Sequence, residues 1–195
     1  MPSIALHLTA FDGGNALPTF RAQALRHRLQ NVDGSVTGIS ARHVHWVASD
    51  TPLDASSTDR LQALLSYGDV ADAPAAGDLV LVMPRLGTVS PWASKATDIA
   101  RNCGLALRRV ERVTEFLVQR KGGLFASTKP LAPGARDALA ALLHDRMTET
   151  VAFEHDAARA LFDEHPGVPM VHVDVLGRGP IEGRKALVAA NLEFG

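Results

Sequence analysis

The sequence predicts a mixed α+β or α/β fold, built from a duplicated strand–helix–strand–helix module and followed by a small linker region. Three observations lead to this prediction. Strand-like and helix-like patterns alternate along the chain, a leucine-rich pattern occurs twice at a fixed separation, and ordered patterns become sparse towards the end. We therefore expect one domain over residues 1–150, with repeats at about 1–72 and 78–150, and a linker region over residues 151–195.

The first repeat is expected to contain two strands and two helices. Residues 4–11 form an apolar run typical of a strand, and residues 36–48 are rich in β-branched and aromatic side chains. Between them, residues 20–29 place apolar side chains at helical spacing. Residues 59–66 predict the second helix, and Gly68 follows as a stop signal.

The second repeat follows a connector at residues 72–77 that is rich in proline, alanine and glycine. Its strand, helix, strand and helix are predicted at residues 79–83, 91–102, 107–120 and 136–145. The dipeptide Ser90-Pro91 is a strong helix start, because serine caps the first turn and proline suits the first helical position. Gly104 is placed to end that helix.

One pattern supports a true duplication. The leucine-rich residues recur 78 positions further on, with Leu53, Asp59, Leu61, Ala63, Leu64 and Leu65 matching Leu131, Asp137, Leu139, Ala141, Leu142 and Leu143. This separation is longer than usual solenoid repeats, so it indicates two fused copies of a small α/β module. The alternative is an amphipathic helix of a common kind, since short apolar patterns are degenerate.

The last part of the chain has a different character. Residues 154–164 predict a short helix, which His165-Pro166-Gly167 breaks, and residues 169–175 have an extended pattern. Residues 184–194 predict a final helix. Because no polar tail follows this helix, we expect the chain to be a fragment of a longer protein.

The composition limits the classes of function. The chain has 195 residues, of which 46% are hydrophobic and 21% are charged, as in globular proteins. A net charge of −1 does not favour a basic surface for nucleic acid. There is no signal-peptide pattern, no apolar run long enough to span a bilayer, and a single cysteine. We expect a cytoplasmic protein with neither a nucleic-acid nor a membrane partner.

Residues 83–98 form the most unusual segment, because they join a buried strand to a helix and carry glycine, hydroxyl and cationic side chains. A helix N-terminus presents unpaired N–H groups, and Arg85 and Lys95 add positive charge, so an anion such as a phosphate could bind here. The spacing is not that of a Walker A loop. The alternative is a well-capped helix that packs Trp92 into the fold.

Two histidines and the cysteine are weaker candidates. His43 and His45 share one face of the second strand, but no third ligand follows at a spacing that would complete a metal site. We therefore expect no metal, a solvated or interface strand face at these histidines, and Trp46 in the core on the other face. Cys103 ends a helix, far from the N-terminal end that activates thiols, so we expect a small buried residue.

Two long stretches resemble a known family. Arg85-Leu86-Gly87-Thr88-Val89-Ser90-Pro91-Trp92-Ala93-Ser94-Lys95-Ala96-Thr97-Asp98-Ile99-Ala100, with Asn102-Cys103-Gly104-Leu105 after it, is similar to a signature of large, single-chain phosphoribosylformylglycinamidine synthases. His144-Asp145-Arg146-Met147-Thr148-Glu149-Thr150-Val151 resembles a second signature. Weaker similarities lie at Val110-Glu111-Arg112 and at residues 173–177. The resemblance spans most of the chain and implies the N-terminal region of such an enzyme.

The resemblance implies both a fold and a reaction. The N-terminal domain of this family is similar to a fused pair of the small accessory (PurS-like) subunit of multi-subunit enzymes. The parent reaction converts formylglycinamide ribonucleotide, ATP and glutamine to formylglycinamidine ribonucleotide, with ATP and magnesium bound elsewhere in the parent. The implied partners are the synthase and glutaminase domains of the same polypeptide. No catalytic residue and no cofactor site of the family falls on this chain.

The resemblance leaves a supporting role for this chain. We expect a loop that contacts substrate or a neighbouring domain, formed by Arg85, Gly87, Thr88, Ser90, Trp92, Ser94, Lys95 and Asp98. A second set with possible domain contacts comprises His144, Arg146 and Glu149; a solvated helix end or acid–base chemistry are the other interpretations of this polar cluster. Two alternative functions are a free-standing accessory subunit and a phosphate-ligand-binding protein without ligase activity.

Overall fold

The computed structural model describes residues 6–70, 76–121, 131–163, 170, 172–177 and 179–194. The chain forms two compact units, residues 1–163 and residues 164–195. The start of the first predicted strand, most of the predicted connector and residues 164–169 lie outside the described residues.

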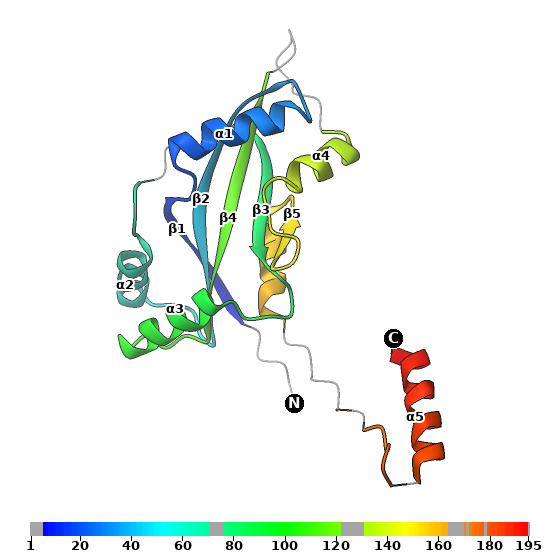
Figure 1. Ribbon diagram of the computed structural model, residues 1–195. Coiled ribbons are helices and arrows are strands. Elements are labelled where there is room, and N and C mark those ends of the chain that lie inside the picture. The colour runs from blue at the N-terminus through cyan, green and yellow to red at the C-terminus, as the bar shows by residue number, and fades with distance from the viewer. Residues whose placement is uncertain are drawn as a thin grey trace. The chain divides into compact units, whose positions relative to one another are not determined.

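The first unit is built on a five-stranded antiparallel sheet with the strand order β1-β2-β4-β3-β5 (Figure 1). The strands are β1 (His7–Asn15), β2 (Val36–Ser49), β3 (Asp78–Pro84), β4 (Arg109–Arg120) and β5 (Glu149–Ala152). The two long central strands pair with each other, with Val44 opposite Val113. A mixed α+β fold with alternating strands and helices is therefore confirmed.

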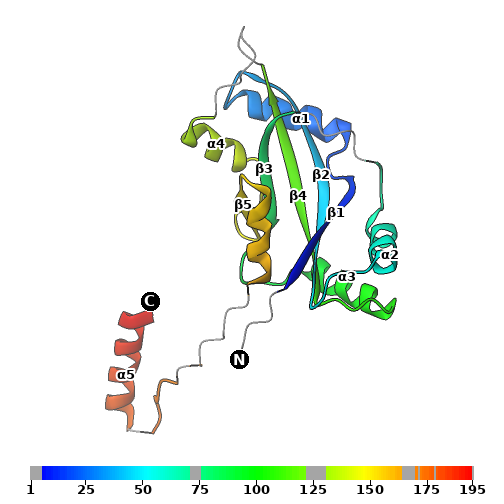
Figure 2. The same cartoon turned by 180° about the vertical axis from the view of Figure 1, so that it is seen from behind.

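Four helices connect the strands: α1 (Thr19–Gln30), α2 (Ala55–Leu65), α3 (Pro91–Asn102) and α4 (Pro133–Ala140). They cover one face of the sheet, and α1 passes in front of the strands in Figure 1 and behind them in Figure 2. The alternation of side chains along β4 explains these layers. Val118 packs with α1 and α4, Val110 packs with α2 and α3, and Val113 points to the opposite face.

The order of elements is consistent with a duplicated module. β1 and β3 flank the central pair on either side, and each is followed by a helix that leads into a central strand. Helices α1 and α3 both have 12 residues. Thr19 and Pro91, which begin them, are 72 positions apart, whereas Ala55 and Pro133, which begin α2 and α4, are 78 apart. Asp59 and Leu61 of the leucine-rich pattern lie on α2, and their counterparts Asp137 and Leu139 lie on α4, whereas the last three residues of the second copy, 141–143, follow α4 in a turn.

The end of the first unit differs from the predicted pattern. The predicted helix over residues 136–145 ends at Ala140, and a short strand, β5, follows it. The predicted helix at residues 154–164 is a 3-10 helix, η1 (His155–Phe162). Its Ala158, Leu161 and Phe162 are buried against the face of the sheet that α1–α4 leave open. The first compact unit therefore extends past the boundary expected at residue 150, because burying η1 covers that face.

The second unit contains a single described helix, α5 (Gly179–Phe194), which begins five residues before the predicted start at residue 184. Its large apolar side chains are exposed, at Ile181, Leu187, Val188 and Leu192. Among the described residues, no helix combines the length and the apolar character needed to cross a membrane.

Candidate functional site

The two signature stretches meet at the end of β3. Met83 pairs with Thr150 and Pro84 with Glu149, so β5 brings the second signature beside the first. One step further, the Arg85 backbone N–H donates to the Thr148 carbonyl oxygen at 3.0 Å. We call residues 85–89 and 144–148 the loop–turn surface. Its two segments are about 60 residues apart in the sequence and adjacent in the fold.

The loop half of this surface has a defined shape. The backbone N–H and the side-chain hydroxyl of Thr88 both donate to the Arg85 carbonyl oxygen, at 3.3 and 2.6 Å. Gly87 has a φ of +76°, a conformation that side chains disfavour, which explains a glycine at this point. The Arg109 guanidinium donates to the Thr88 carbonyl oxygen at 3.1 Å and ties the loop to β4.

The turn half is held by its own polar groups. The Asp145 carboxylate accepts from the Met147 backbone N–H at 2.8 Å, and the Glu149 carboxylate accepts from the Asp145 N–H at 2.7 Å. His144 contacts the Ala140 carbonyl oxygen through Nδ1 at 2.6 Å. The polar atoms of His144 and Glu149 thus hold the turn, whereas Arg146 projects from it.

Cationic and apolar side chains are exposed on the loop–turn surface. Arg85 and Arg146 are exposed and form no ion pair among the described residues. The neighbouring exposed apolar side chains are Leu86, Val89 and, at 81% exposure, Met147. An exposed methionine between arginines is a composition that protein interfaces favour.

The start of α3 is occupied by a buried carboxylate. Ser90 caps the helix, with its hydroxyl accepting from the Ala93 N–H at 3.0 Å. Glu111 is fully buried and pairs with Arg109, and burial raises the pKa of its carboxyl despite that partner. The Ser90 hydroxyl lies close enough to lower the pKa of Glu111 slightly, yet Glu111 Oε2 has no hydrogen bond of normal geometry among the described residues. The Arg109–Glu111 pair therefore lies beside the start of α3.

The remaining residues of the predicted loop lie along α3 and point elsewhere. Trp92 stacks on His45 with ring centroids 5.3 Å apart, and the Arg112 guanidinium lies 4.8 Å from the centre of the Trp92 ring. The Ser94 hydroxyl donates to the Ser90 carbonyl oxygen at 3.3 Å, and Asp98 is exposed. Lys95 lines a groove beside α2. The predicted residues thus divide between the loop–turn surface, the start of α3 and the helix itself, where Trp92 packs inward on His45.

The histidine face is buried rather than solvated. His45 has no exposed surface, and its Nε2 lies 3.0 Å from the Tyr67 hydroxyl. Burial lowers the pKa of both His43 and His45 to about 4, helped by the nearby Arg112, so both are neutral at pH 7. A β-carbon added to Gly13 would lie 2.6 Å from His45 Cε1, so only glycine permits this close approach. The expectation of a solvated or interface face is wrong at His45. Trp46 is buried on the other face, as predicted.

Metal ligands and the cysteine complete the set of sequence candidates. In the described part of the chain, no three histidine, cysteine or acidic side chains gather closely enough to hold a metal ion. Cys103 is exposed, contrary to the expected burial. Cys103 caps the end of α3, and its carbonyl oxygen accepts a hydrogen bond from the Arg60 guanidinium. The contact at this position is therefore made by the backbone of Cys103 and not by its thiol.

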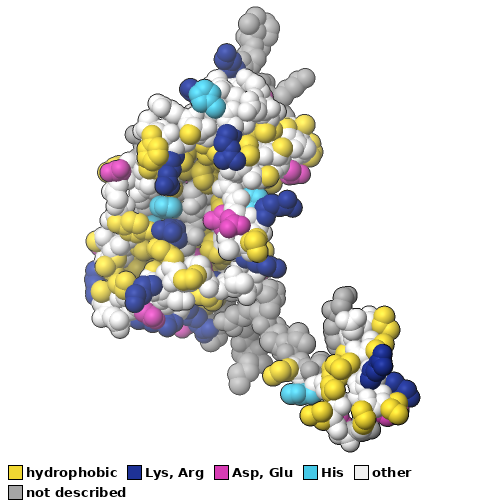
Figure 3. Space-filling model, viewed as in Figure 1, with side chains coloured by type: hydrophobic (Ala, Val, Ile, Leu, Met, Phe, Trp, Pro, Cys, Tyr) yellow, Lys and Arg dark blue, Asp and Glu magenta, His cyan; other side chains and the backbone are white. Residues whose placement is uncertain are grey.

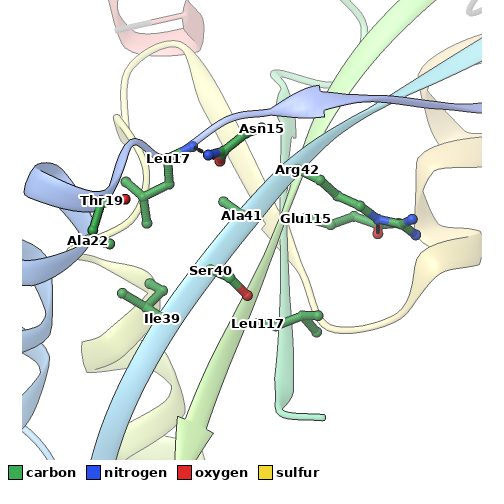
Figure 4. A pocket seen from close by; sticks show the side chains of 10 residues that line it. All are labelled: Asn15, Leu17, Thr19, Ala22, Ile39, Ser40, Ala41, Arg42, Glu115 and Leu117. Atoms are coloured by element: carbon green, nitrogen blue, oxygen red, sulfur yellow. Dashed lines mark hydrogen bonds and ion pairs between the residues drawn. The ribbon is translucent and has the colours of Figure 1, made fainter. Parts of the chain in front are cut away.

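A cavity of ≈ 170 Å³ lies where β1 ends and the chain crosses to α1 (Figure 4). Arg42 and Glu115 line it and form an ion pair at 2.8 Å. Arg42 also contacts Asp12 at 2.9 Å, and Glu115 contacts His155 at 2.7 Å. The sequence does not predict this network, because its members lie on β1, β2, β4 and η1. Arg42 is thus paired with both Asp12 and Glu115, and the contact between Glu115 and His155 holds η1 against the sheet.

A family model described as "Formylglycinamide ribonucleotide amidotransferase N-terminal" matches residues 42–162. The match covers more than half of the 195 residues and ends at the last residue of η1. The chain therefore belongs to this family, and the resemblance to the N-terminal region of phosphoribosylformylglycinamidine synthase is confirmed.

Proposed function

We propose that this member of the formylglycinamide ribonucleotide amidotransferase N-terminal family is a structural domain, which supports catalysis by docking on the rest of its parent synthase. The parent would convert formylglycinamide ribonucleotide, ATP and glutamine to formylglycinamidine ribonucleotide, ADP, phosphate and glutamate. Family membership supports this reaction. Glutamine hydrolysis and the ATP- and magnesium-dependent step would belong to the glutaminase and synthase domains of the same polypeptide.

The use of the polar groups supports a docking role over a catalytic one. The buried acids Glu111 and Glu115 are paired with arginines, and His45 is neutral and buried beneath Trp92. His144 and Glu149 hold a turn. Catalytic acids and bases need access to a substrate, whereas these groups are engaged in contacts within the domain.

The observation that carries the proposal is the loop–turn surface. Both signature stretches contribute to it, and it combines unpaired guanidinium groups with exposed Met147 and Val89. Arginine and buried apolar anchors supply much of the binding energy of protein interfaces. We therefore assign this surface to the contact with the synthase domain.

A phosphate contact at the start of α3 is less well supported than a domain contact. Glu111 lies beside Ser90 and already takes up the Arg109 guanidinium, so that cation is not free to bind a phosphate there. Lys95, which was expected to add positive charge to that site, lines the groove beside α2 instead. Of the two cations predicted to bind an anion here, only Arg85 therefore lies on the loop–turn surface.

Replacing Arg85 and Arg146 by alanine in the complete enzyme tests the docking role. We expect the double variant to lose about tenfold in kcat/KM for formylglycinamide ribonucleotide, with a lower Tm, because an interface contact of about 1.4 kcal/mol corresponds to a factor of ten. A raised KM at unchanged Tm would indicate direct contact with substrate instead. Unchanged kinetics and unchanged Tm would rule out both roles.

A further inference from the structure

An apolar groove runs between α2 and α3 on the helical face. It has a volume of ≈ 250 Å³ and is lined mainly by leucine, alanine and aromatic side chains from both helices. Leu64, Tyr67 and Ile99 form an exposed rim. Figure 3 shows hydrophobic side chains gathered over this part of the surface.

The groove exists because the two halves of the molecule pack their helices differently. On α1, Ala22, Leu25 and Leu29 face the core and pack with the leucines of α4. On α3, the buried side chains are Ala93, Thr97 and Ala100, and Ala96 is partly buried beside them. The buried positions of α3 thus carry alanine and threonine, where α1 packs two leucines. The smaller side chains leave space between α3 and α2, whereas the leucines of α1 fill the space between α1 and α4.

The walls of the groove are fixed before anything binds. Trp92 packs against the His45 ring and the Arg112 guanidinium, which are cross-strand partners on β2 and β4. The Tyr67 hydroxyl contacts His45 Nε2 at 3.0 Å and accepts from Arg112 at 3.3 Å. A site whose side chains are already ordered loses little conformational entropy on binding. The groove is therefore suited to receive a side chain.

Positive charge lines one side of the groove. Lys95 is part of its lining and has no ion pair among the described residues. Arg112 packs on Trp92 and donates to the Tyr67 hydroxyl, and it too forms no ion pair among the described residues. An occupant that brings a carboxylate would complement both cations.

We propose that the α2–α3 groove receives a leucine- or phenylalanine-sized side chain, next to a carboxylate, from another domain of the parent polypeptide. This inference rests on the proposed function for the identity of the partner. It adds a second docking point, lined by α2 and α3, to the loop–turn surface. A side chain of the partner domain would then fill the space that the small side chains of α3 leave open.

Ala96→Leu in the complete enzyme tests the groove, with Ala24→Leu on the exposed side of α1 as the matched control. The new leucine occupies the space of the incoming side chain. We expect kcat/KM to fall at least tenfold and the amides of α2 and α3 to exchange hydrogen faster, while Ala24→Leu leaves both unchanged. As a second variant, Lys95→Glu is expected to weaken the same contact and to speed exchange in the same amides.

An unoccupied groove would give a different result. Ala96→Leu would then raise Tm by filling space, with kcat/KM and hydrogen exchange equal to those of Ala24→Leu, and this would overturn the proposal. If that result appears while Arg85→Ala/Arg146→Ala is impaired, the groove inference fails and the docking function stands. A complete protein without synthase activity would instead contradict the proposed function, and hydrogen exchange at α2 and α3 would still report on the groove.

Discussion

The two halves of the sheet share an order of elements but not a pattern of packing. In the helical layer, Leu25 and Leu29 of α1 pack with Leu139 of α4. Helix α3 instead presents alanines to α2, and a groove remains between these two helices. At the outer strands, β3 pairs with the additional strand β5, and η1 packs on the sheet beside it. The pairing of β3 with β5 brings the second signature beside the first. The repeat thus provides the scaffold, and the departures from it form the surfaces assigned to docking.

The largest expected effect compares two equivalent leucines. Leu139 on α4 and Leu61 on α2 are both fully buried and are related by the 78-residue repeat. Leu139→Ala should cost about 3–5 kcal/mol in the free energy of unfolding, because it leaves an enclosed cavity. Leu61→Ala should cost less, about 2–3 kcal/mol, since it enlarges a groove that is already open to solvent. Urea unfolding measures both; equal losses would contradict the difference in packing.

The next effect concerns pH and the buried histidines of β2. Their pKa is about 4 in the folded chain and near 6.5 in the unfolded chain, so the unfolded state binds more protons between these values. The free energy of unfolding should therefore fall as the pH is lowered from about 6.5 to 4. His45→Phe should flatten this dependence by on the order of 3 kcal/mol over that range. Urea unfolding of both proteins across this pH range measures the slopes; equal slopes would show that His45 is not buried in the neutral form.

The smallest effect concerns helix capping, which also differs between the halves. Ser90 caps α3 with its hydroxyl, whereas Pro18, at the matching position of α1, provides no side-chain cap. Ser90→Ala should cost about 1 kcal/mol in the free energy of unfolding. Pro18→Ala should cost less, because no side-chain hydrogen bond is lost there. Thermal unfolding resolves the two, and a Ser90→Ala variant as stable as the parent would contradict the role of the cap.

Much of the fold follows from local signals. The helix that begins at Ser90-Pro91 is found where predicted, because a cap and a proline act within one turn. The duplication is visible because Asp59 and Leu61 of α2 recur as Asp137 and Leu139 of α4. The strand β5 is not predicted, because four residues carry too little periodicity and the strand depends on pairing with β3.

The site is harder to predict from the sequence than the fold. Residues of both signatures are recognisable one by one, but their contact depends on the Pro84–Glu149 pairing, which no local pattern encodes. The burial of His45 likewise needs Gly13, Tyr67 and Trp92 from three other segments. Alternation along β2 identifies the face on which His45 lies but not what covers it.

Hydrogen exchange in the complete synthase tests the docking role most directly. The amides of Leu86, Val89 and Met147 belong to exposed residues in this domain, as does that of Ala24 on α1. If the loop–turn surface contacts the synthase domain, the first three should exchange much more slowly in the complete enzyme than in its Arg85→Ala/Arg146→Ala variant, while Ala24 stays unchanged. Equal exchange at the loop–turn surface in both proteins would contradict the docking role.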